Sequence, residues 1–195
     1  MRGRIAELVM SGAMPLAKCW VPEILEDADN ELPGSFRSLM ARLLDHLKEL
    51  EAEIQRWHRN NPTSLKLAQV GGVGPLTASA ISASVGDART FKNGRQMAAW
   101  LGIVPRQHST GGKSTLLGIS KRGDTYLRTL LIHGARAVIR MAERKPEDAD
   151  PWLKNLLSRR HKNVAAVALA NKNARILWAL LAHDREYQAD YRRAA

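Results

Sequence analysis

The feature that most constrains the fold is a run of apolar side chains at steps of three and four residues between residues 35 and 60. The residues in this run are Phe36, Leu39, Met40, Leu43, Leu44, Leu47, Leu50, Ile54 and Trp57. An α-helix turns once in about 3.6 residues, so this spacing gathers the apolar side chains on one side of a helix. The pattern predicts one long amphipathic helix that ends near Asn60-Asn61-Pro62, since proline interrupts a helix.

The apolar stripe of this predicted helix is narrow, and its other positions carry charges of both signs. Such a helix suits an antiparallel hairpin or a coiled-coil pairing, but a helix packed on its own domain has the same spacing. Both interpretations stay open at this point. Residues 1–34 contain several Gly and Pro residues and an acidic patch, which predict a connector with short or interrupted helices.

The rest of the chain also favours helices. Aromatic residues make up only 5% of the sequence, a balance that disfavours sheets. Asn93 and Asp124 are expected N-caps of two of the helices. Residues 103–123 have no helical period and many Gly, Ser and Thr residues, so we expect a long loop with a function. The sequence predicts an all-α fold with a connector at 1–34, a coiled-coil-like helical arm at 35–62 and a compact helical domain at 63–195.

The positive charge of the chain is concentrated in one segment. The formal net charge is +11, and between Arg89 and Lys145 the sequence has 12 Lys or Arg residues against 2 Asp or Glu residues. Clustered cations gain affinity for a nucleic acid by releasing counterions from its phosphates. We therefore expect an anionic polymer as the first candidate partner, although a solvated basic surface that only aids solubility has the same composition.

Cysteine content and hydropathy indicate the compartment in which the protein is expected to work. The single cysteine, Cys19, cannot form a disulfide within the chain, and no Cys and His residues stand at metal-ligand spacing. We expect a reducing compartment, no metal site and no cofactor in this chain. No stretch approaches the roughly 20 apolar residues that span a bilayer, and no signal peptide is evident. The expectation is a cytoplasmic protein without membrane contact.

Residues 65–86 have the pattern of a helix-hairpin-helix motif, in which a Gly-x-Gly turn precedes a helix of small residues. Glycines let the backbone approach a phosphate, and the free amides at the start of the second helix donate to an anion. We assign contacts with the DNA backbone to Gly72, Gly74 and Thr77. A tight turn between two helices without a ligand is the alternative.

The predicted loop carries two hydroxyl side chains, Ser109 and Thr110, among glycines and cations. The residues that we assign to DNA binding around them are Arg106, His108, Lys113, Lys121, Arg122 and Arg128. A hydroxyl that attacks phosphorus needs cations beside it, because negative charge develops on the nonbridging oxygens. His108 either orients or deprotonates the hydroxyl, or it hydrogen-bonds a phosphate or solvent. A nucleotide-binding P-loop is excluded, because the first glycine of that motif and a preceding buried strand are absent.

Three runs of residues carry a resemblance to a known family. They are Gly102-Ile-Val-Pro-Arg-Gln-His-Ser-Thr-Gly-Gly-Lys113, Leu117-Gly-Ile-Ser-Lys-Arg-Gly-Asp-Thr-Tyr-Leu-Arg128 and Leu131-Ile-His-Gly-Ala-Arg136. Together they resemble the insertion-sequence 110 family of transposases, especially its 1111 subgroup. Gly71 to Asp87 and Ala170 to Trp178 look similar as well, so the resemblance covers nearly the whole chain.

The resemblance implies a DNA recombinase that works as an assembly of subunits and whose helical C-terminal domain supplies a serine that becomes joined to DNA. In the family this domain follows an RNase-H-like domain with an acidic metal-binding set, and a coiled coil links the parts. A divalent metal is implied for that other domain only, and this chain resembles a truncated or separately encoded C-terminal portion. Some members are guided by a structured RNA, which is a further implied partner. The helical arm is then the expected contact of a homo-oligomer.

The nucleophile is expected at Ser109, with Thr110 as the alternative. Many relatives have serine directly before the glycine, where this chain has Thr110, and Ser109 stands one residue earlier. Because the acidic domain has no counterpart in the sequence, whether this chain alone is an enzyme stays open. The competing functions are a non-catalytic DNA-binding and oligomerising remnant of a transposase, and an RNA-binding accessory protein.

Overall fold

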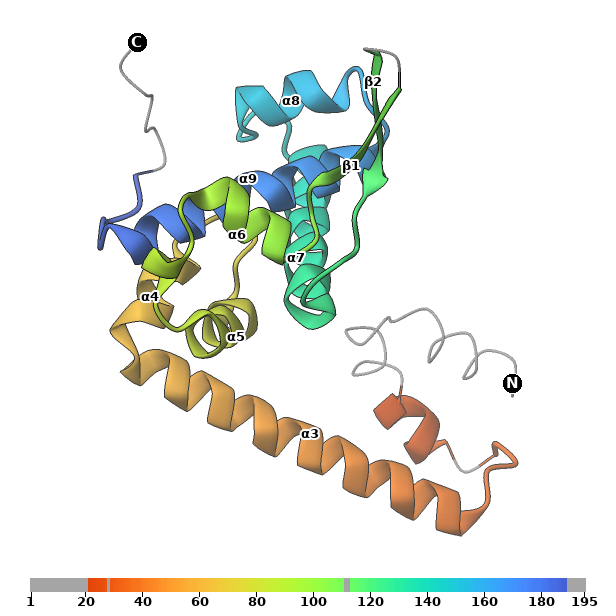
Figure 1. Cartoon of the computed structure of the whole chain (residues 1–195). Coiled ribbons are helices and arrows are strands. Elements are labelled where there is room, and N and C mark those ends of the chain that lie inside the picture. The colour runs from red at the N-terminus through yellow and green to blue at the C-terminus, as the bar shows by residue number, and fades with distance from the viewer. Residues whose placement is uncertain (1–20, 28, 111–112, 189–195) are drawn as a thin grey trace. The chain divides into compact units, whose positions relative to one another are not determined.

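The computed structural model describes residues 21–27, 29–110 and 113–188, and it is mostly helical (Figure 1). Its elements are α3 (Gly34–Asn60), α4 (Pro62–Ala68), α5 (Pro75–Val85), η1 (Ala88–Thr90), α6 (Gly94–Trp100), β1 (Pro105–Thr110), β2 (Lys113–Ile119), α7 (Thr125–Arg144), α8 (Pro151–Leu157) and α9 (Lys162–Ala182). The predicted all-α class is confirmed, and a two-stranded sheet is the exception in the described part of the chain. The chain divides into two compact units, residues 1–53 and residues 54–195.

In the first unit, Arg37 fastens the start of α3 to the chain before it. Its guanidinium donates to the carbonyl oxygens of Leu25 and Asp27, both at 2.8 Å, and to that of Asn30 at 3.0 Å. The Asn30 side chain accepts a further hydrogen bond from the same group. Arginine suits this place because its donors have fixed directions and satisfy several backbone carbonyls at once. The helical segment at residues 21–26 is thereby closed onto α3.

Helix α3 matches the long helix expected at residues 35–60, and its apolar side chains follow a heptad spacing. At alternating steps of four and three residues it holds Phe36, Met40, Leu43, Leu47, Leu50, Ile54 and Trp57, which we call the α3 seam. Sustained heptads are typical of coiled coils. Every second member is exposed, Leu43 by 54% and Leu50 by 43%. Leu43 and Leu50 of the seam are therefore available to a partner, whereas Ile54 and Trp57 line a pocket together with residues of α5.

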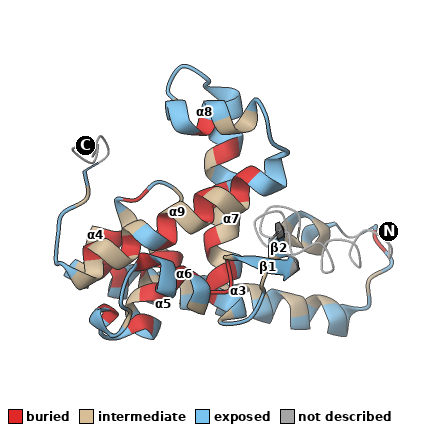
Figure 2. Cartoon of the chain, turned by 45° about the horizontal axis from the view of Figure 1, so that its top comes forward, coloured by how far each residue is buried: buried red, intermediate tan, exposed pale blue. Residues whose placement is uncertain are grey.

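Helix α9 is the central helix of the second unit. It packs against α4, α6, α7 and α8, and Figure 2 shows buried residues along α9 and α7 in red. Its buried side chains are Ala165, Ala166, Leu169, Ala170, Asn173, Ala174, Leu177 and Leu180. We expected no stretch that is long and apolar enough to cross a membrane. This expectation was wrong for α9, which is long and apolar enough by length and composition. Its apolar composition has a structural explanation, because these side chains form the core.

The glycine turn between α4 and α5 packs directly on α7. A Cβ atom built on Gly134 of α7 meets the Gly72 carbonyl oxygen at 1.8 Å, and one built on Gly72 meets the Gly134 carbonyl oxygen at 2.9 Å. Backbone therefore touches backbone at this crossing, which only glycine permits. From α9, the amide of the buried Asn173 donates to the Gly71 carbonyl at 2.8 Å. The turn is thus held by two helices of the core.

Residues 105–119 form a β-hairpin where the sequence analysis expected a loop, and that prediction was wrong. Strand β1 pairs antiparallel with β2, so that Ser109 lies opposite Ser114. The strands satisfy backbone groups that an irregular loop leaves to water. The signal in the sequence is Gly111-Gly112, a typical two-residue connection of a hairpin, between segments that contain Thr, Leu and Ile. The segment was assigned by its lack of helical period alone, which does not distinguish a loop from a strand.

Alanine at position 134 tests the backbone crossing. The added Cβ has no space beside the Gly72 carbonyl, so the Gly134→Ala variant is expected to lose about 2 kcal/mol of unfolding free energy, as overpacked cores do. Chemical denaturation followed by circular dichroism measures this. Gly118→Ala is the matched control, because nothing lies within 4 Å of a Cβ built there. Equal stability of the two variants would contradict the crossing.

Candidate nucleic-acid interface

The base of the hairpin meets the end of α6 in close backbone contact. A Cβ built on Gly123 meets the Trp100 carbonyl oxygen at 1.8 Å, and one built on Gly102 meets the Arg122 carbonyl oxygen at 2.3 Å. The two glycines have φ angles of 122° and 71°, which other residues rarely adopt. No side chain therefore fits at either position. We call this contact, between residues 100–102 and residues 122–123, the hairpin joint.

Backbone hydrogen bonds continue from the joint into the strands. The Lys121 amide donates to the Gly102 carbonyl at 3.1 Å, and the Ser120 amide donates to the Val104 carbonyl at 2.8 Å. These bonds extend the pairing of β1 and β2 down to the helices. The hairpin is thereby connected to α6 and α7 without an intervening unpaired segment.

Arg128 of α7 supports the joint from inside the fold. It is only 8% exposed, and its guanidinium donates to the Leu101 carbonyl at 3.1 Å and to the Thr125 hydroxyl at 3.0 Å. The sequence analysis assigned Arg128 to DNA binding. In the structure its donors hold the end of α6 against α7. Arg128 therefore stabilises the fold beneath the hairpin and does not face solvent.

Ser109 stands on β1 with an exposed side chain. Its Oγ accepts a hydrogen bond from Nε2 of Gln107 at 2.9 Å, and the two side chains meet because residues two apart on a strand share a face. The hydroxyl oxygen is thus oriented while its own proton stays available for transfer. The sequence analysis did not single out Gln107. Residues 107 and 109 are expected to share a face only if the segment is a strand, and we had expected a loop.

His108 is exposed but is not brought to Ser109. Neighbouring residues on a strand point to opposite faces, and His108 lies opposite Thr115 in the pairing. Of its two interpretations, contact with a phosphate or solvent therefore fits the hairpin better than deprotonation of Ser109. Arg106, also exposed, lies at the irregularity in the strand pairing between Pro105 and Gln107.

Thr110 and Lys113 are opposite each other at the ends of their strands. The side chains of both, together with Gly111-Gly112, lie outside the residues that the structure describes. The alternative nucleophile is thus located by its backbone, directly after Ser109 on β1. Its orientation toward the cations stays a prediction.

Two exposed cations, Lys121 and Arg122, stand at the foot of the hairpin. Neither has an acidic partner among the described residues. Asp124, the acidic residue next to them, is engaged as the N-cap of α7, where it accepts from the Leu127 amide at 2.8 Å. The structure therefore collects Arg106, His108, Ser109, Lys121 and Arg122 on one hairpin and its base, with all five side chains exposed.

The glycine turn offers fewer groups to a DNA phosphate than the sequence analysis expected. Gly74 is exposed and caps α5, but the next residue, Pro75, has no amide hydrogen to donate. Gly72 packs on α7, and Thr77 is 7% exposed. The prediction of two short helices joined by a glycine turn is confirmed. Gly72 and Thr77 are used in packing, which agrees with the alternative of a tight turn without a ligand. A phosphate contact of the helix-hairpin-helix kind stays a prediction.

A different serine forms a buried contact with a histidine. Ser64 Oγ lies 2.7 Å from Nδ1 of His58 and 3.3 Å from Oγ of Ser79. The pairing of hydroxyl and imidazole is one that nucleophilic enzymes use, but Ser64 is fully buried. No substrate reaches it, so these side chains join α4 and α5 to the end of α3. Nothing in the sequence indicated this contact, because it depends on how the helices cross.

Residues 64–154 match the family model described as the Transposase IS116/IS110/IS902 family. The matched range contains the glycine turn, the hairpin and α7. The chain carries a transposase domain of this family. The resemblance stated from the sequence motifs is thereby confirmed.

Curated relatives of this transposase family agree with the match. The chain is 56% identical, over 80% of its length, to a probable family 20 transposase of Pseudomonas aeruginosa. It is 50% identical, over 72% of its length, to the transposase for insertion sequence element IS1111A of Coxiella burnetii, and 41% identical, over 77%, to that for IS1328 of Yersinia enterocolitica. The alignments cover 48%, 38% and 47% of these relatives. The chain thus spans about half the length of the curated relatives that it matches.

Proposed function

We propose that this transposase domain acts in DNA transposition by joining a DNA strand to Ser109. The observation that supports the proposal best is the exposed Ser109 hydroxyl, oriented by Gln107, on a hairpin with cations at its foot. In the proposed step a bond forms between Ser109 Oγ and a DNA phosphorus, and a backbone P–O bond breaks. The serine proton passes to water, and the leaving deoxyribose oxygen takes up a proton.

In this proposal, cations of the hairpin and its base supply the electrostatic part of the step. Charge on the nonbridging oxygens rises in the transition state, and fixed positive groups stabilise it. Arg106, Lys121 and Arg122 are exposed without acidic partners among the described residues. Arginine in particular offers two parallel donors to a phosphate. We assign these three residues and His108 to the DNA backbone, together with Lys113 of β2.

We further propose that this chain works without a cofactor of its own. Among the described residues, no group of three His, Cys, Asp or Glu side chains is placed to hold a metal ion. We assign the divalent metal that the resemblance implies to a separate acidic domain. A structured guide RNA is a second polyanion for the same cations, and competition between duplex DNA and folded RNA distinguishes the two.

The Ser109→Ala variant tests the covalent step. Duplexes with a bridging phosphorothiolate at the scissile position trap such an intermediate, because the departing thiolate re-attacks poorly. We expect the unmodified chain to form a denaturant-resistant protein–DNA adduct, and Ser109→Ala to form none while its DNA affinity changes less than about twofold. Gel electrophoresis of radiolabelled DNA measures the adduct. Thr110→Ala and Ser120→Ala are matched controls and are expected to keep it.

Two results would contradict the covalent proposal. An adduct that persists in Ser109→Ala and disappears in Thr110→Ala would move the nucleophile to Thr110. DNA binding without an adduct from any variant would favour the alternative function, a non-catalytic DNA-binding and oligomerising remnant.

We also propose that two copies of the chain pair through the α3 seam. A heptad seam with exposed leucines at regular positions is complementary to a second copy of itself. Large apolar side chains in a continuous row stabilise such a pair because they leave water on association. The seam, rather than the basic hairpin, is then the contact of the homo-oligomer.

Aspartate in the seam tests this pairing. The double variant Leu43→Asp with Leu50→Asp places charges on both copies in the apolar contact, so we expect a shift to monomer by light scattering. Ala41→Asp with Ala52→Asp is the matched control, because these positions lie outside the seam and add the same charge. An unmodified chain that is already monomeric at high concentration, or a control that dissociates equally, would contradict the seam.

A further inference from the structure

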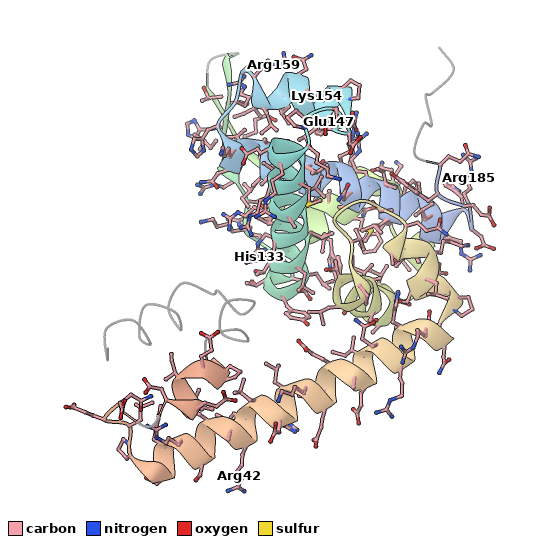
Figure 3. All side chains as sticks on the ribbon, turned by 180° about the vertical axis from the view of Figure 1, so that it is seen from behind. Arg42, His133, Glu147, Lys154, Arg159 and Arg185 are labelled. Atoms are coloured by element: carbon pink, nitrogen blue, oxygen red, sulfur yellow. The ribbon has the colours of Figure 1, made fainter. Side chains whose placement is uncertain are left out.

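Helix α7 has one face in the core and the opposite face in solvent. Its buried side chains are Leu127, Arg128, Leu131, Ala135 and Ile139. Among its exposed polar side chains, Thr129, His133, Arg136, Arg140 and Arg144 follow one another at steps of four, three, four and four residues, and Thr125, Tyr126 and the acidic Glu143 are exposed as well. These steps align the side chains along one line of the helix, which we call the α7 stripe. Figure 3 shows His133 on the outer side of this helix.

The α7 stripe is unfavourable for the helix in the absence of a ligand. Like charges four residues apart on a helix repel each other, and Arg136, Arg140 and Arg144 repeat at that spacing. None of the three has an acidic partner among the described residues. The nearby Glu143 is engaged with Lys162 at 2.6 Å. A polyanion bound along the stripe would offset this repulsion, because the negative charge of its phosphates attracts the arginines.

Several other cations in the described chain are paired with acidic side chains. Ion pairs join Lys48 to Asp45, Lys66 to Asp184, Arg89 to Asp87 and Lys172 to Asp150. Helix α3 mixes its arginines with glutamates along the sequence. The α7 stripe, by contrast, has only cationic, imidazole and hydroxyl side chains.

The position of the stripe connects it to the hairpin. Lys121 and Arg122 stand shortly before Asp124, the N-cap of α7, and the next exposed arginine along the chain is Arg136 of the stripe. From Thr129 to Arg144 the stripe is about 22 Å long, at about 1.5 Å per helical residue. Duplex DNA carries one charge in about 1.7 Å of its axis with both strands counted, so a duplex segment of this length carries on the order of a dozen phosphates, of which the stripe can meet those on one side.

We propose that the α7 stripe is a second phosphate-binding surface, which lies along the backbone of duplex DNA while the hairpin meets the reacting strand. The proposal rests on the proposed function, since both surfaces hold the same DNA. The stripe reads no sequence, because its cations contact phosphates only. The buried side chains on the opposite face of α7 and the Gly72–Gly134 crossing fix the helix backbone from which these arginines project.

The triple variant Arg136→Gln, Arg140→Gln, Arg144→Gln tests this surface. Glutamine keeps the helix propensity and removes three charges. Each lost phosphate contact lowers the slope of log affinity against log salt by about 0.9, so we expect a slope reduced by between about 2 and 3. At low salt we expect duplex affinity to fall at least about tenfold for loss of several such contacts. Fluorescence anisotropy with a labelled random-sequence duplex measures both.

The matched control is Arg42→Gln, Arg56→Gln, Arg59→Gln, which removes three exposed arginines of α3. It is expected to bind duplex DNA with the slope of the unmodified chain. Circular dichroism melting of both variants must show the same folded fraction. An α7 variant that binds like this control overturns the second surface, as does one that loses affinity for a folded RNA and keeps it for duplex DNA.

The adduct assay separates this proposal from the proposed function. If Ser109 forms an adduct and the α7 variant binds DNA normally, only the second surface is wrong. If the α7 variant loses DNA affinity but no chain forms an adduct, the second surface stands and the covalent function is wrong.

Discussion

The direct contact of backbone with backbone at the hairpin joint is the constraint on which the rest of the structure depends. Gly123 lies against the Trp100 carbonyl and Gly102 against the Arg122 carbonyl, at distances that no Cβ permits. A two-stranded hairpin is marginal by itself in water. Because this one is paired down to the joint, its orientation follows the orientation of α6 and α7. The joint is thus what places Ser109 and the cations at the foot of the hairpin relative to the core.

Helix α7 serves the core and the surface at the same time. Gly134 allows the glycine turn to pack on it, and Arg128 uses its donors to hold the end of α6. The exposed arginines stand on the other face of the same rigid helix. Arginines of one helix therefore have different surroundings, which burial and hydrogen bonding distinguish and residue type does not. A cation count alone overstates the surface available to DNA.

Local signals in the sequence predicted most of the helices. Asn93 and Asp124 were expected as N-caps and accept hydrogen bonds from the amides of Gln96 and Leu127. The features that escaped prediction depend on contacts between distant segments. Thr77 and Arg128 are polar residues that tertiary packing buries, and the Ser64–His58 contact needs two helices to cross. The hairpin was missed because β1 has no alternation of apolar and polar side chains, since neither of its faces is buried.

Site-directed photocrosslinking tests most directly whether the hairpin meets DNA. Leu116 is 69% exposed and pairs with Gln107, so it shares a face with Ser109. A benzophenone side chain at Leu116 is expected to crosslink to bound duplex DNA, and one at Leu65 of α4, which is 44% exposed, is expected to crosslink far less. Crosslinking from Leu65 with none from Leu116, at equal DNA occupancy, would contradict the account.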